Sequence, residues 1–339
     1  MRILATGGAG YVGSVSVDAF VQAGHEVTVL DDLSTGHRSA VTKNATLVVG
    51  SYGDTSAVTA LLTERRIEAV LHCAAKSIVS ESMADPAKYY RENVAGGIAL
   101  LEAMRTAGVK RIVFSSTAAT YGMPERTPIQ ESDPVRPINT YGETKRAVEG
   151  AIGWYGHAYG FRSVILRYFN VAGATPRNGE LHSPETHLIP VILQAAEEGR
   201  GLTLFGADYP TQDGTCIRDY IHVEDLAVAH LLALLATDPA DARTGPAVGA
   251  CQPLICNLGN GAGFSNLQVV AAAERVVGHP IPVEMGPRRV GDPAVLVASS
   301  TRAAEVLEWQ PRHLDIDEII GSAWAWRRAN PSGSADRQG

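Results

Sequence analysis

The sequence begins with a short apolar run, Arg2 to Gly7, that leads directly into the glycine-rich stretch GGAGYVG. Gly7, Gly10 and Gly13 are spaced three residues apart, and a helix-like segment follows them. A second apolar run, Glu26 to Asp31, then ends on a carboxylate. Glycines in this arrangement let the backbone approach a pyrophosphate, while the helix directs its N–H groups and its positive dipole end at the anion. The beginning of the chain therefore predicts a strand–turn–helix unit that binds a dinucleotide.

Apolar, β-branched runs continue along the chain and alternate with helix-like segments. After the first two, they span Thr46 to Gly50, Glu68 to Ala74, Arg111 to Ser116 and Ser163 to Asn170. Strands that are apolar along their whole length and alternate with helices indicate a parallel sheet covered on both faces. The predicted fold class is α/β: a Rossmann-type doubly wound parallel sheet with a smaller C-terminal α/β domain that binds substrate.

The two predicted domains are each built from two stretches of the chain. Residues 1–171 and about 219–260 are assigned to the dinucleotide-binding domain, because YIHVEDLAVAHLLALL and LICNLG look like a further helix and strand of the same sheet. Residues from about 172 to 218 and from 261 to 328 are assigned to the substrate domain. The stretch from Thr237 to Pro253 is rich in Ala, Gly and Pro, which predicts a surface loop, and residues 329–339 are predicted to form a flexible tail.

Composition limits the classes of partner. Of the 339 residues, 45% are hydrophobic and 19% are charged, which is typical of a globular protein. The formal charge of -7 argues against binding nucleic acid through a basic surface. No apolar run approaches the ~20 residues of a membrane span, and the first strand leaves no room for a signal peptide. The cysteines, Cys73, Cys216, Cys251 and Cys256, form no C-x-x-C pair. We therefore expect a cytoplasmic protein with reduced cysteines, no metal site, and neither nucleic acid nor membrane as a partner.

Asp31 bears on the identity of the dinucleotide. At the end of the second strand its carboxylate would accept hydrogen bonds from both adenosine ribose hydroxyls and would repel a 2′-phosphate. This arrangement favours NAD over NADP as the cofactor. Asp32 could share the ribose contact or be an ordinary turn residue, and Arg38 could favour NADP instead.

Tyr141 and Lys145, in the stretch NTYGETK, are four residues apart and would share one face of a helix. Such a pair is common by chance and could simply be solvated. Here, however, Thr117 lies at the end of a predicted strand, in FSSTAATYG, and ligands bind at the carboxyl ends of parallel strands. We therefore expect Thr117 and Tyr141 to meet over the nicotinamide, although the threonine hydroxyl could also cap the backbone at its strand end.

These three side chains suit the oxidation of an alcohol. A tyrosine with its ordinary pKa of about 10 is a poor base at neutral pH. The Lys145 ammonium and the positive nicotinamide would both favour the phenolate and so lower the pKa of Tyr141. Thr117 would bind the substrate oxygen, Tyr141 would remove its proton while NAD takes the hydride, and Lys145 could also hold the nicotinamide ribose.

The glycine spacing and the Tyr-x-x-x-Lys pair together are similar to those of the extended short-chain dehydrogenase/reductase superfamily. Longer segments, above all DGTCIRDYIHVEDLA, with LRYFNVAGA, HLIP and NLGNG, resemble the UDP-glucose 4-epimerase family over about residues 1–328. The resemblance implies interconversion of UDP-glucose and UDP-galactose: bound NAD oxidises C4, the 4-keto sugar turns, and hydride returns to its other face. It also implies a homodimer built on the helices around residues 86–106 and 141–159.

The resemblance carries a set of expected contacts. Catalytic roles fall on Tyr141, Lys145 and Thr117. Cofactor contacts are expected at Gly7, Gly10, Tyr11, Val12, Gly13, Asp31, Asp32, Ser34, Gly36, Ser51, Tyr52, Cys73, Ala74, Ala75, Asn93, Ser115, Tyr141, Lys145 and Tyr168. Contacts with the nucleotide sugar are expected at Thr117, Tyr141, Phe169, Asn170, His187, Leu188, Thr203, Phe205, Arg218, Arg289, Asp292 and Leu296. The two arginines agree with the chemistry, since guanidinium groups suit phosphate oxygens. Asp219 and His222 are expected to be structural, capping the helix that follows them.

Related activities differ at the two positions after Thr117. Nucleotide-sugar dehydratases carry an Asp-Glu pair there and decarboxylating relatives a Glu at the second position, whereas this chain has Ala118 and Ala119. Neither elimination nor decarboxylation is therefore expected. A net oxidoreductase with an exchangeable cofactor stays open. A catalytically silent scaffold is disfavoured, because Thr117, Tyr141 and Lys145 are all present.

Three positions depart from the better-known pattern of the family. Ser51 stands where an Asp commonly contacts adenine, and Ser77 stands where a Lys commonly lies near the nicotinamide. Lys76 is one residue away and would point in another direction. Both changes weaken the expectation that NAD is tightly retained. Leu296 falls where a bulky Tyr closes the sugar pocket, so UDP-GlcNAc and UDP-GalNAc are open as further substrates.

Overall fold

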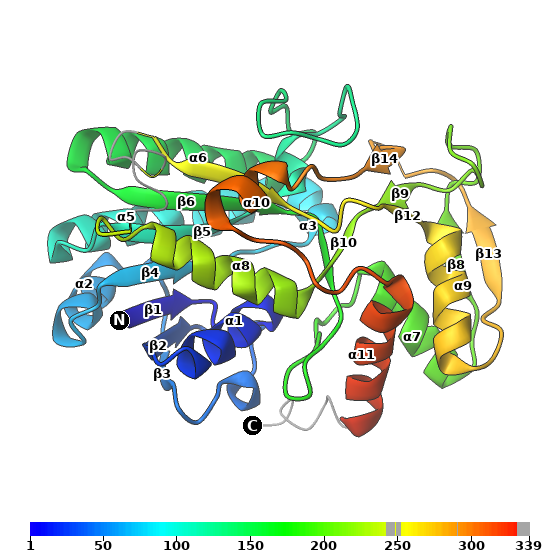
Figure 1. The fold of residues 1–339 in the computed structure, drawn as a ribbon, viewed down its shortest axis with the longest axis horizontal. Coiled ribbons are helices and arrows are strands. Elements are labelled where there is room, and N and C mark those ends of the chain that lie inside the picture. The colour runs from blue at the N-terminus through cyan, green and yellow to red at the C-terminus, as the bar shows by residue number, and fades with distance from the viewer. Residues whose placement is uncertain (242–247, 249–251, 290, 331–339) are drawn as a thin grey trace.

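The computed structural model describes residues 1–241, 248, 252–289 and 291–330. Its centre is a seven-stranded sheet with the order β11-β6-β5-β4-β1-β2-β3 (Figure 1). The strands are β1 (Arg2–Thr6), β2 (Glu26–Asp31), β3 (Thr46–Val49), β4 (Ala69–His72), β5 (Arg111–Thr117), β6 (Arg162–Tyr168) and β11 (Leu254–Leu258). Every neighbouring pair is parallel. The predicted doubly wound α/β class is confirmed, and the segment LICNLG does add a strand to this sheet.

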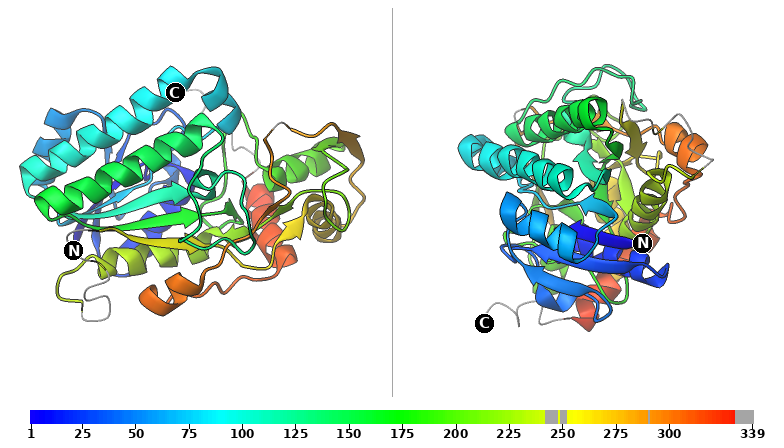
Figure 2. Two further views of the ribbon diagram at one scale, coloured as in Figure 1. Left: turned by 90° about the horizontal axis from the view of Figure 1, so that it is seen from above. Right: turned by 90° about the vertical axis from the view of Figure 1, so that its left-hand side faces the viewer.

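Helices cover both faces of the sheet. One face carries α1 (Tyr11–Gln22), α8 (Val223–Ala236) and α10 (Thr301–Leu307), and the other carries α2 (Thr55–Glu64), α5 (Gly96–Ala107) and α6 (Thr140–Tyr159). The left view of Figure 2 shows α5 and α6 on one side of the sheet and α8 and α10 on the other. Gly108 ends α5 with a φ of 76°, which is the left-handed C-cap that glycine adopts without steric cost.

The two helical layers explain why the strands are apolar along their whole length. In β1, Ile3 and Ala5 pack against the layer of α1 and α8, whereas Leu4 packs against the layer of α2 and α5. All three side chains are fully buried. Successive residues of a strand point to opposite faces, so a sheet buried on both faces needs apolar residues at every position.

A second group of elements packs beyond the carboxyl ends of the sheet strands, at the right of Figure 1. It contains the helices α7 (Leu188–Glu198), α9 (Asn266–Val277) and α11 (Ile316–Ala329), and the strands β7 (Asn170–Ala172), β8 (Leu202–Phe205), β9 (Ile217–Arg218), β10 (Tyr220–His222), β12 (Phe264–Ser265), β13 (Val283–Gly286) and β14 (Val295–Leu296). These helices share a hydrophobic core of their own. The exact domain bounds stay a prediction.

Short elements complete the described chain. They are α3 (Val79–Ala84), α4 (Pro86–Tyr89), a π-helix η2 (Tyr90–Ala95), and the 3-10 turns η1 (Arg38–Ala40) and η3 (Ala118–Thr120). Residues 242–247 and 249–251 of the predicted surface loop and residues 331–339 of the predicted tail lie outside the described residues. Ala329, which was assigned to the tail, is the last residue of α11.

Asp219 and His222 have the structural character that the sequence suggests, although only one of them is a cap. His222 Nδ1 accepts the backbone N–H of Glu224 at 3.1 Å and so caps α8. The buried Asp219 carboxylate instead accepts three backbone N–H groups, from Asn260 at 2.6 Å and from Gly261 and Ala298 at 3.0 Å. It therefore ties the loops after β11 and β14 together, next to Arg218.

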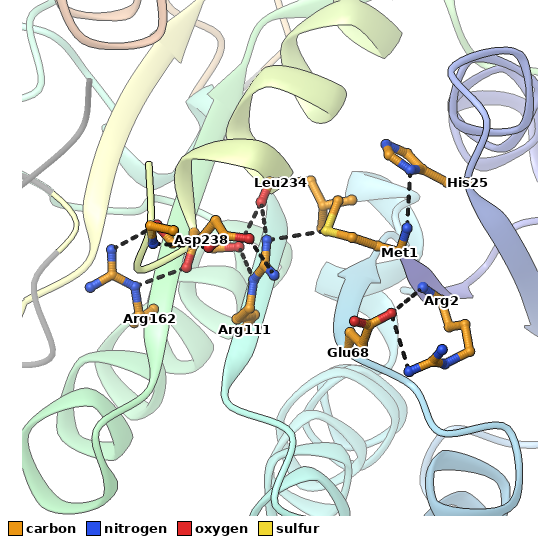
Figure 3. Close-up of polar contacts among 10 residues, drawn as sticks. Met1, Arg2, His25, Glu68, Arg111, Arg162, Leu234 and Asp238 are labelled. Carbon is orange, nitrogen blue, oxygen red and sulfur yellow. Dashed lines mark hydrogen bonds and ion pairs between the residues drawn. The ribbon is translucent and has the colours of Figure 1, made fainter. Parts of the chain in front are cut away.

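Arg111 and Arg162, at the starts of β5 and β6, form hydrogen bonds with the C-terminal end of α8 (Figure 3). Arg111 donates to the Leu234 carbonyl at 3.2 Å, to the Thr237 hydroxyl at 3.0 Å and to the Asp238 carboxylate at 3.1 Å. Arg162 donates to the Thr237 carbonyl at 2.8 Å. Carbonyls at a helix C-terminus lack intrahelical partners and carry partial negative charge. The two guanidinium groups supply the missing hydrogen-bond donors and place positive charge beside these carbonyls.

Among the described residues, no helix combines the length and the apolar character that crossing a bilayer requires. Cys73, Cys216 and Cys256 are free thiols.

We expect Arg111→Met to lower the free energy of unfolding by about 1–3 kcal/mol, because it removes the three hydrogen bonds that Arg111 donates at the end of α8. Equilibrium urea denaturation measures the change. Arg275→Met is the matched control, since Arg275 forms an exposed ion pair with Asp317 at 2.6 Å that is worth about 0–1 kcal/mol. Equal losses in the two variants would contradict a special role for Arg111.

Candidate active site

The glycine turn after β1 is as tight as its sequence requires. Gly7 has a φ of 73°, and a Cβ added there would lie 2.6 Å from the backbone nitrogen of Ala74, in the segment after β4. A Cβ on Gly10, by contrast, would meet only the Gly7 carbonyl, at 3.4 Å. The first turn of α1 has no side-chain cap and no acidic residue, so its positive end is available to an anion. This backbone cradle fits a dinucleotide pyrophosphate.

Asp31 lies at the end of β2 and is held by the glycine turn itself. Its carboxylate accepts the N–H of Ala9 and that of Leu33, both at 2.9 Å. Burial raises the pKa of Asp31 and these two N–H groups oppose the shift. Each carboxylate oxygen has a second lone pair, so the side chain fits the ribose-binding role predicted for it.

Lys76 has a position that the sequence reasoning left open. Its ammonium donates to the Ser34 hydroxyl at 2.7 Å, beside Asp32, whose carboxylate accepts the N–H of Ser34 at 2.9 Å. Burial acts to raise the pKa of Asp32, but the hydrogen bonds from Ser34 and the charge of Lys76 lower it overall. The Lys76 ammonium therefore lies beside Ser34 and Asp32, at the predicted ribose site.

Other predicted cofactor residues line the carboxyl ends of β4 and β5. Ser115 Oγ lies 3.1 Å from Cys73 Sγ and 3.1 Å from Nε2 of His230, a buried residue of α8. Burial lowers the pKa of His230 to about 3, so its imidazole is neutral. Asn93 uses its amide to bind the backbone of Lys76, at 2.8 and 2.9 Å, and the Thr144 hydroxyl at 3.1 Å. Asn93 thus fixes the segment after β4 against α6.

The remaining predicted cofactor residues occupy the same end of the sheet. Tyr11, Val12 and Gly36 adjoin the glycine turn, and a Cβ on Gly36 would lie 2.9 Å from the Asp31 carboxylate. Ser51 and Tyr52 follow β3, Ala74 and Ala75 follow β4, and Tyr168 ends β6. Ser51 Oγ accepts the N–H of Gly53 at 3.1 Å.

Thr117, Tyr141 and Lys145 come together at the carboxyl end of β5, as the sequence predicts. Asn139 caps α6 by accepting the N–H of Gly142 at 2.8 Å, which places Tyr141 and Lys145 in the first two turns of that helix. The Thr117 hydroxyl is a hydrogen-bond partner of the Tyr141 phenol. Lys145 is buried, donates to the Ser115 carbonyl at 2.8 Å, and its ammonium lies 4.8 Å from the centre of the Phe114 ring.

The pKa values at this site differ from one sequence expectation. Burial raises the pKa of Tyr141 to about 12, and the hydrogen bond with Thr117 is the contribution that opposes it. The Lys145 ammonium donates to the Ser115 carbonyl, and with a pKa of about 8 it has already lost its charge at the pH where Tyr141 titrates in the protein alone. Burial also lowers the pKa of Lys145 to about 8, against the charges of Cys73 and Glu149. In the protein alone, Tyr141 is a neutral phenol at neutral pH.

A buried ion pair supports α6 one turn beyond Lys145. The Glu149 carboxylate accepts two hydrogen bonds from Arg167 of β6, at 2.5 and 2.9 Å, and one from Ser116 of β5 at 2.5 Å. Arg167 also donates to Tyr121 Oη at 3.0 Å, and that hydroxyl donates to Asn257 of β11 at 2.7 Å. This network fixes the catalytic helix to three strands of the sheet. In the sequence, Tyr141, Lys145 and Glu149 are spaced at i, i+4 and i+8, and this spacing could have predicted that Glu149 lies on the same face of the helix.

The second group of elements contributes two arginines that the sequence assigned to the nucleotide sugar. Arg218 in β9 is buried and forms an ion pair with Asp292. The Arg289 guanidinium lies 4.4 Å from the centre of the Phe205 ring in β8. Thr203 and Phe205 share β8, and Leu296 pairs with Arg218 between β14 and β9. These residues form one group, with guanidinium donors suited to phosphate oxygens.

Other predicted substrate residues connect this group with the catalytic one. Phe169 and Asn170 follow Tyr168 at the end of β6, and Phe169 packs with Ala118, next to Thr117. Leu296 packs against the same cluster. His187 and Leu188 lie at the start of α7. His187 also contacts Glu180, His182 and Glu185, a set of side chains that the sequence reasoning missed. The stretch ELHSPETH between β7 and α7, which holds these Glu and His residues close together, could have predicted the set.

The fold and the site together define a Rossmann-type dinucleotide-binding protein in which Thr117, Tyr141 and Lys145 lie at the carboxyl end of β5. The sequence model of the NAD dependent epimerase/dehydratase family matches residues 3–245, and the chain belongs to this family. It is 49% identical to a UDP-glucose 4-epimerase of Lacticaseibacillus casei, with 99% of this chain and 100% of the relative covered. It is 51% identical to that of Streptococcus mutans, with the same coverage. The crystal structure of the Brucella ovis UDP-glucose 4-epimerase in complex with NAD matches with a TM-score of 0.89 at 43% identity, over 96% of this chain and 97% of the other.

We expect Lys145→Met to stabilise the protein at neutral pH. The pKa of Lys145 is about 8 in the folded protein against an ordinary 10.5, so the unfolded chain binds more protons between these values. Below pH 8 the lysine is charged in both states, and the cost of burying that charge lowers the free energy of unfolding by its full amount. This cost decreases as the pH rises from 8 to 10.5, because the buried lysine loses its proton first. At pH 7 the free energy of unfolding should rise by about 1–3 kcal/mol in the variant, as measured by urea denaturation.

The same comparison at pH 10.5 is the control, because the wild-type lysine is then neutral in the folded protein and only half protonated in the unfolded chain, so most of the gain should disappear. A variant that is less stable than the wild type at pH 7 would contradict this account of Lys145.

Proposed function

We propose that the protein interconverts UDP-glucose and UDP-galactose with bound NAD as its cofactor. The observation that carries this proposal is the placement of Thr117, Tyr141 and Lys145 beside the glycine cradle, in a chain whose relatives of about half identity over their full length are UDP-glucose 4-epimerases. The absence of an acid or base at Ala118 and Ala119 supports epimerisation over elimination.

The chemistry that bound NAD would supply is reversible acceptance of the hydride from C4 of the hexose. The cradle of Gly7, Gly10 and Gly13 with Asp31 would hold the dinucleotide. Thr117 would donate to the O4 atom or accept from it, and Tyr141 would remove the O4 proton and later return it. Because the pKa of Tyr141 is about 12 in the protein alone, the phenol becomes a base only when positive charge adjoins it.

Arg218 and Arg289 would fix the diphosphate while the sugar is free to turn. Arg218 is buried in an ion pair with Asp292, so it is held in place before substrate binds. A diphosphate bound by preorganised guanidinium groups acts as a tether, and the hexose beyond it can present either face to the same cofactor.

We expect Tyr141→Phe to lower kcat about 10²–10⁴-fold while the fold stays intact, since general acid–base catalysis contributes an effect of this size. Proton NMR of UDP-galactose incubated with the purified protein, with no NAD added, follows the anomeric signal of UDP-glucose. Tyr155→Phe is the matched control, because Tyr155 lies on the same helix and its hydroxyl contacts Glu102 on the outer side. A fully active Tyr141→Phe variant would contradict the assignment.

A second substrate pair, UDP-GlcNAc and UDP-GalNAc, is favoured by one position. Leu296 is half-buried and packs against the cluster of Ala118, Tyr121 and Phe169 beside the catalytic threonine. A leucine here is smaller than the tyrosine that the family resemblance led us to expect, and the difference would leave room for an acetamido group. We propose that the site accepts both substrate pairs.

Leu296→Tyr should therefore remove activity on the acetamido sugars and leave most of the activity on UDP-glucose. Turnover of both pairs by wild type and variant is compared by the same NMR assay. Wild-type protein without detectable acetamido activity would contradict the proposal, as would a variant that retains both activities in the wild-type ratio.

We also propose that the protein is a homodimer and that it works in the cytoplasm. The outer surface of α3, η2, α5 and α6 carries several exposed apolar side chains, namely Met83, Tyr90, Ile98, Trp154 and Tyr159. Trp154 is 73% exposed. Exposed apolar side chains on neighbouring helices are consistent with a protein–protein interface, and the family resemblance led us to expect a second copy of the chain on these helices.

We expect Trp154→Asp to shift the protein from dimer to monomer, because it places a charge in the interface core. Sedimentation equilibrium at several concentrations gives the molar mass. Met123→Asp is the control, since Met123 is an exposed apolar residue on the loop after η3 and belongs to none of these helices. A wild-type protein that sediments as a monomer at all concentrations would contradict the proposal.

A further inference from the structure

Four metal-ligating side chains converge on the segment between β7 and α7. Glu180, His182, Glu185 and His187 each offer one ligand atom, and these atoms all lie within 4.8 Å of one another. His182 Nδ1 lies 2.8 Å from Glu180 Oε1. His187 Nδ1 lies 2.9 Å from the same oxygen and 2.9 Å from Glu185 Oε1. Two nitrogens and two oxygens thus gather within 4.8 Å of one another.

Both carboxylates of this cluster are largely buried. The side chain of Glu180 is 7% exposed and that of Glu185 is 13% exposed. Glu185 is further held by the N–H groups of Thr186 and His187, at 2.7 and 2.8 Å. Two neighbouring carboxylates removed from water repel each other and lose hydration, so they require compensating positive charge. A divalent cation with two neutral imidazoles would balance both carboxylates.

The donor set and its spacing indicate the type of cation. Zn²⁺ is typically bound by four ligands in a tetrahedron, with imidazole nitrogens and carboxylate oxygens at about 2.0–2.2 Å from the metal. Ligand atoms in such a tetrahedron lie roughly 3.3–3.6 Å apart. The three hydrogen-bonded pairs in this cluster are 2.8–2.9 Å apart and would widen by about half an ångström, whereas the other pairs lie within 4.8 Å. Imidazole suits zinc and its neighbours in the first transition row and does not suit Mg²⁺ or Ca²⁺.

A second cluster of this kind, His222, Glu224 and His313, does not support the same conclusion. Both ring nitrogens of His222 are already used: Nδ1 accepts the N–H of Glu224 at 3.1 Å, and Nε2 lies 3.0 Å from Ser322 Oγ. His222 is buried and its ring stacks on His313 with centroids 4.2 Å apart. These side chains therefore cap and pack α8.

We propose that Glu180, His182, Glu185 and His187 form a structural binding site for one divalent cation, best matched by Zn²⁺. All four positions for ligands come from the protein, as in structural sites. This proposal departs from the sequence-based expectation of no metal site, which rested on the cysteines alone. In this site, Nδ1 of His187 would be a ligand of the cation.

The site has a clear position in the architecture. The segment that carries it begins at Gly173, whose carbonyl accepts the Tyr11 hydroxyl of the glycine turn at 2.6 Å. It contacts the loop after β2 through His37 Nε2, 3.4 Å from the Leu181 carbonyl. It ends at His187, directly before α7. A bound cation would therefore fix the segment between the dinucleotide-binding turn and the first helix of the second group of elements.

Zinc binding by the full-length protein tests the proposal without reference to catalysis. Purified protein is stripped with a chelator, reloaded with Zn²⁺, desalted, and analysed for zinc by mass spectrometry, and the affinity is measured by competition with a chromophoric chelator. We expect one zinc ion per chain and a higher Tm for the loaded protein. His182→Asn removes one ligand outside the predicted catalytic and substrate contacts, and it should weaken binding at least about 10–100-fold. Glu180→Gln should do the same.

His313→Asn is the matched control, because it removes a histidine from the other cluster and should leave zinc binding unchanged. Circular dichroism establishes that each variant is folded. Wild-type protein that binds no stoichiometric zinc would overturn the proposal, whatever the variants do, and would mean that protonated histidines alone pair the carboxylates. Equal affinity in wild type and His182→Asn, or loss of zinc in His313→Asn, would also overturn it.

Discussion

The position of Tyr141 beside Thr117 depends on the buried ion pair between Glu149 of α6 and Arg167 of β6. The pair lies one turn beyond Lys145 and is joined by Ser116 of β5, the residue before Thr117. A buried ion pair adds little net stability, because the lost hydration offsets most of the attraction, whereas removal of one partner is costly. Its effect here is positional: α6 can slide or rotate on the sheet only if these charge-assisted hydrogen bonds break, so Tyr141 keeps its place beside Thr117.

Burial at the same site sets the protonation states. It raises the pKa of Tyr141 to about 12 and lowers the pKa of Lys145 to about 8. Both shifts disfavour the charged form of the side chain, which is the signature of desolvation and not of a mutual ion pair. The proposed reaction therefore needs positive charge beside Tyr141 before the phenol can act as a base. Such a dependence would couple proton removal to the presence of the oxidised dinucleotide.

The sequence predicts the features that depend on local pattern. The glycine turn, the alternating strands and helices, and the approach of Thr117 to Tyr141 are confirmed, because parallel strands with a shared polarity place their carboxyl ends together. Features that depend on side-chain direction were not predicted. The hydrogen bond of the Lys145 ammonium to the Ser115 carbonyl is one such feature. Asn93 binds the backbone of Lys76, and Arg167 of β6 binds Glu149 of α6. Only the packed structure determines these two contacts.

The central claim is that the hydride leaves C4 of the sugar and returns to it from a dinucleotide that stays in its cradle. UDP-galactose carrying deuterium at C4, incubated with the purified protein in ordinary water and with free NAD present, tests this most directly. The account predicts that the UDP-glucose formed retains deuterium at C4 and that the free NAD stays unlabelled. Loss of the label to water, or its appearance in free NAD, would contradict the account.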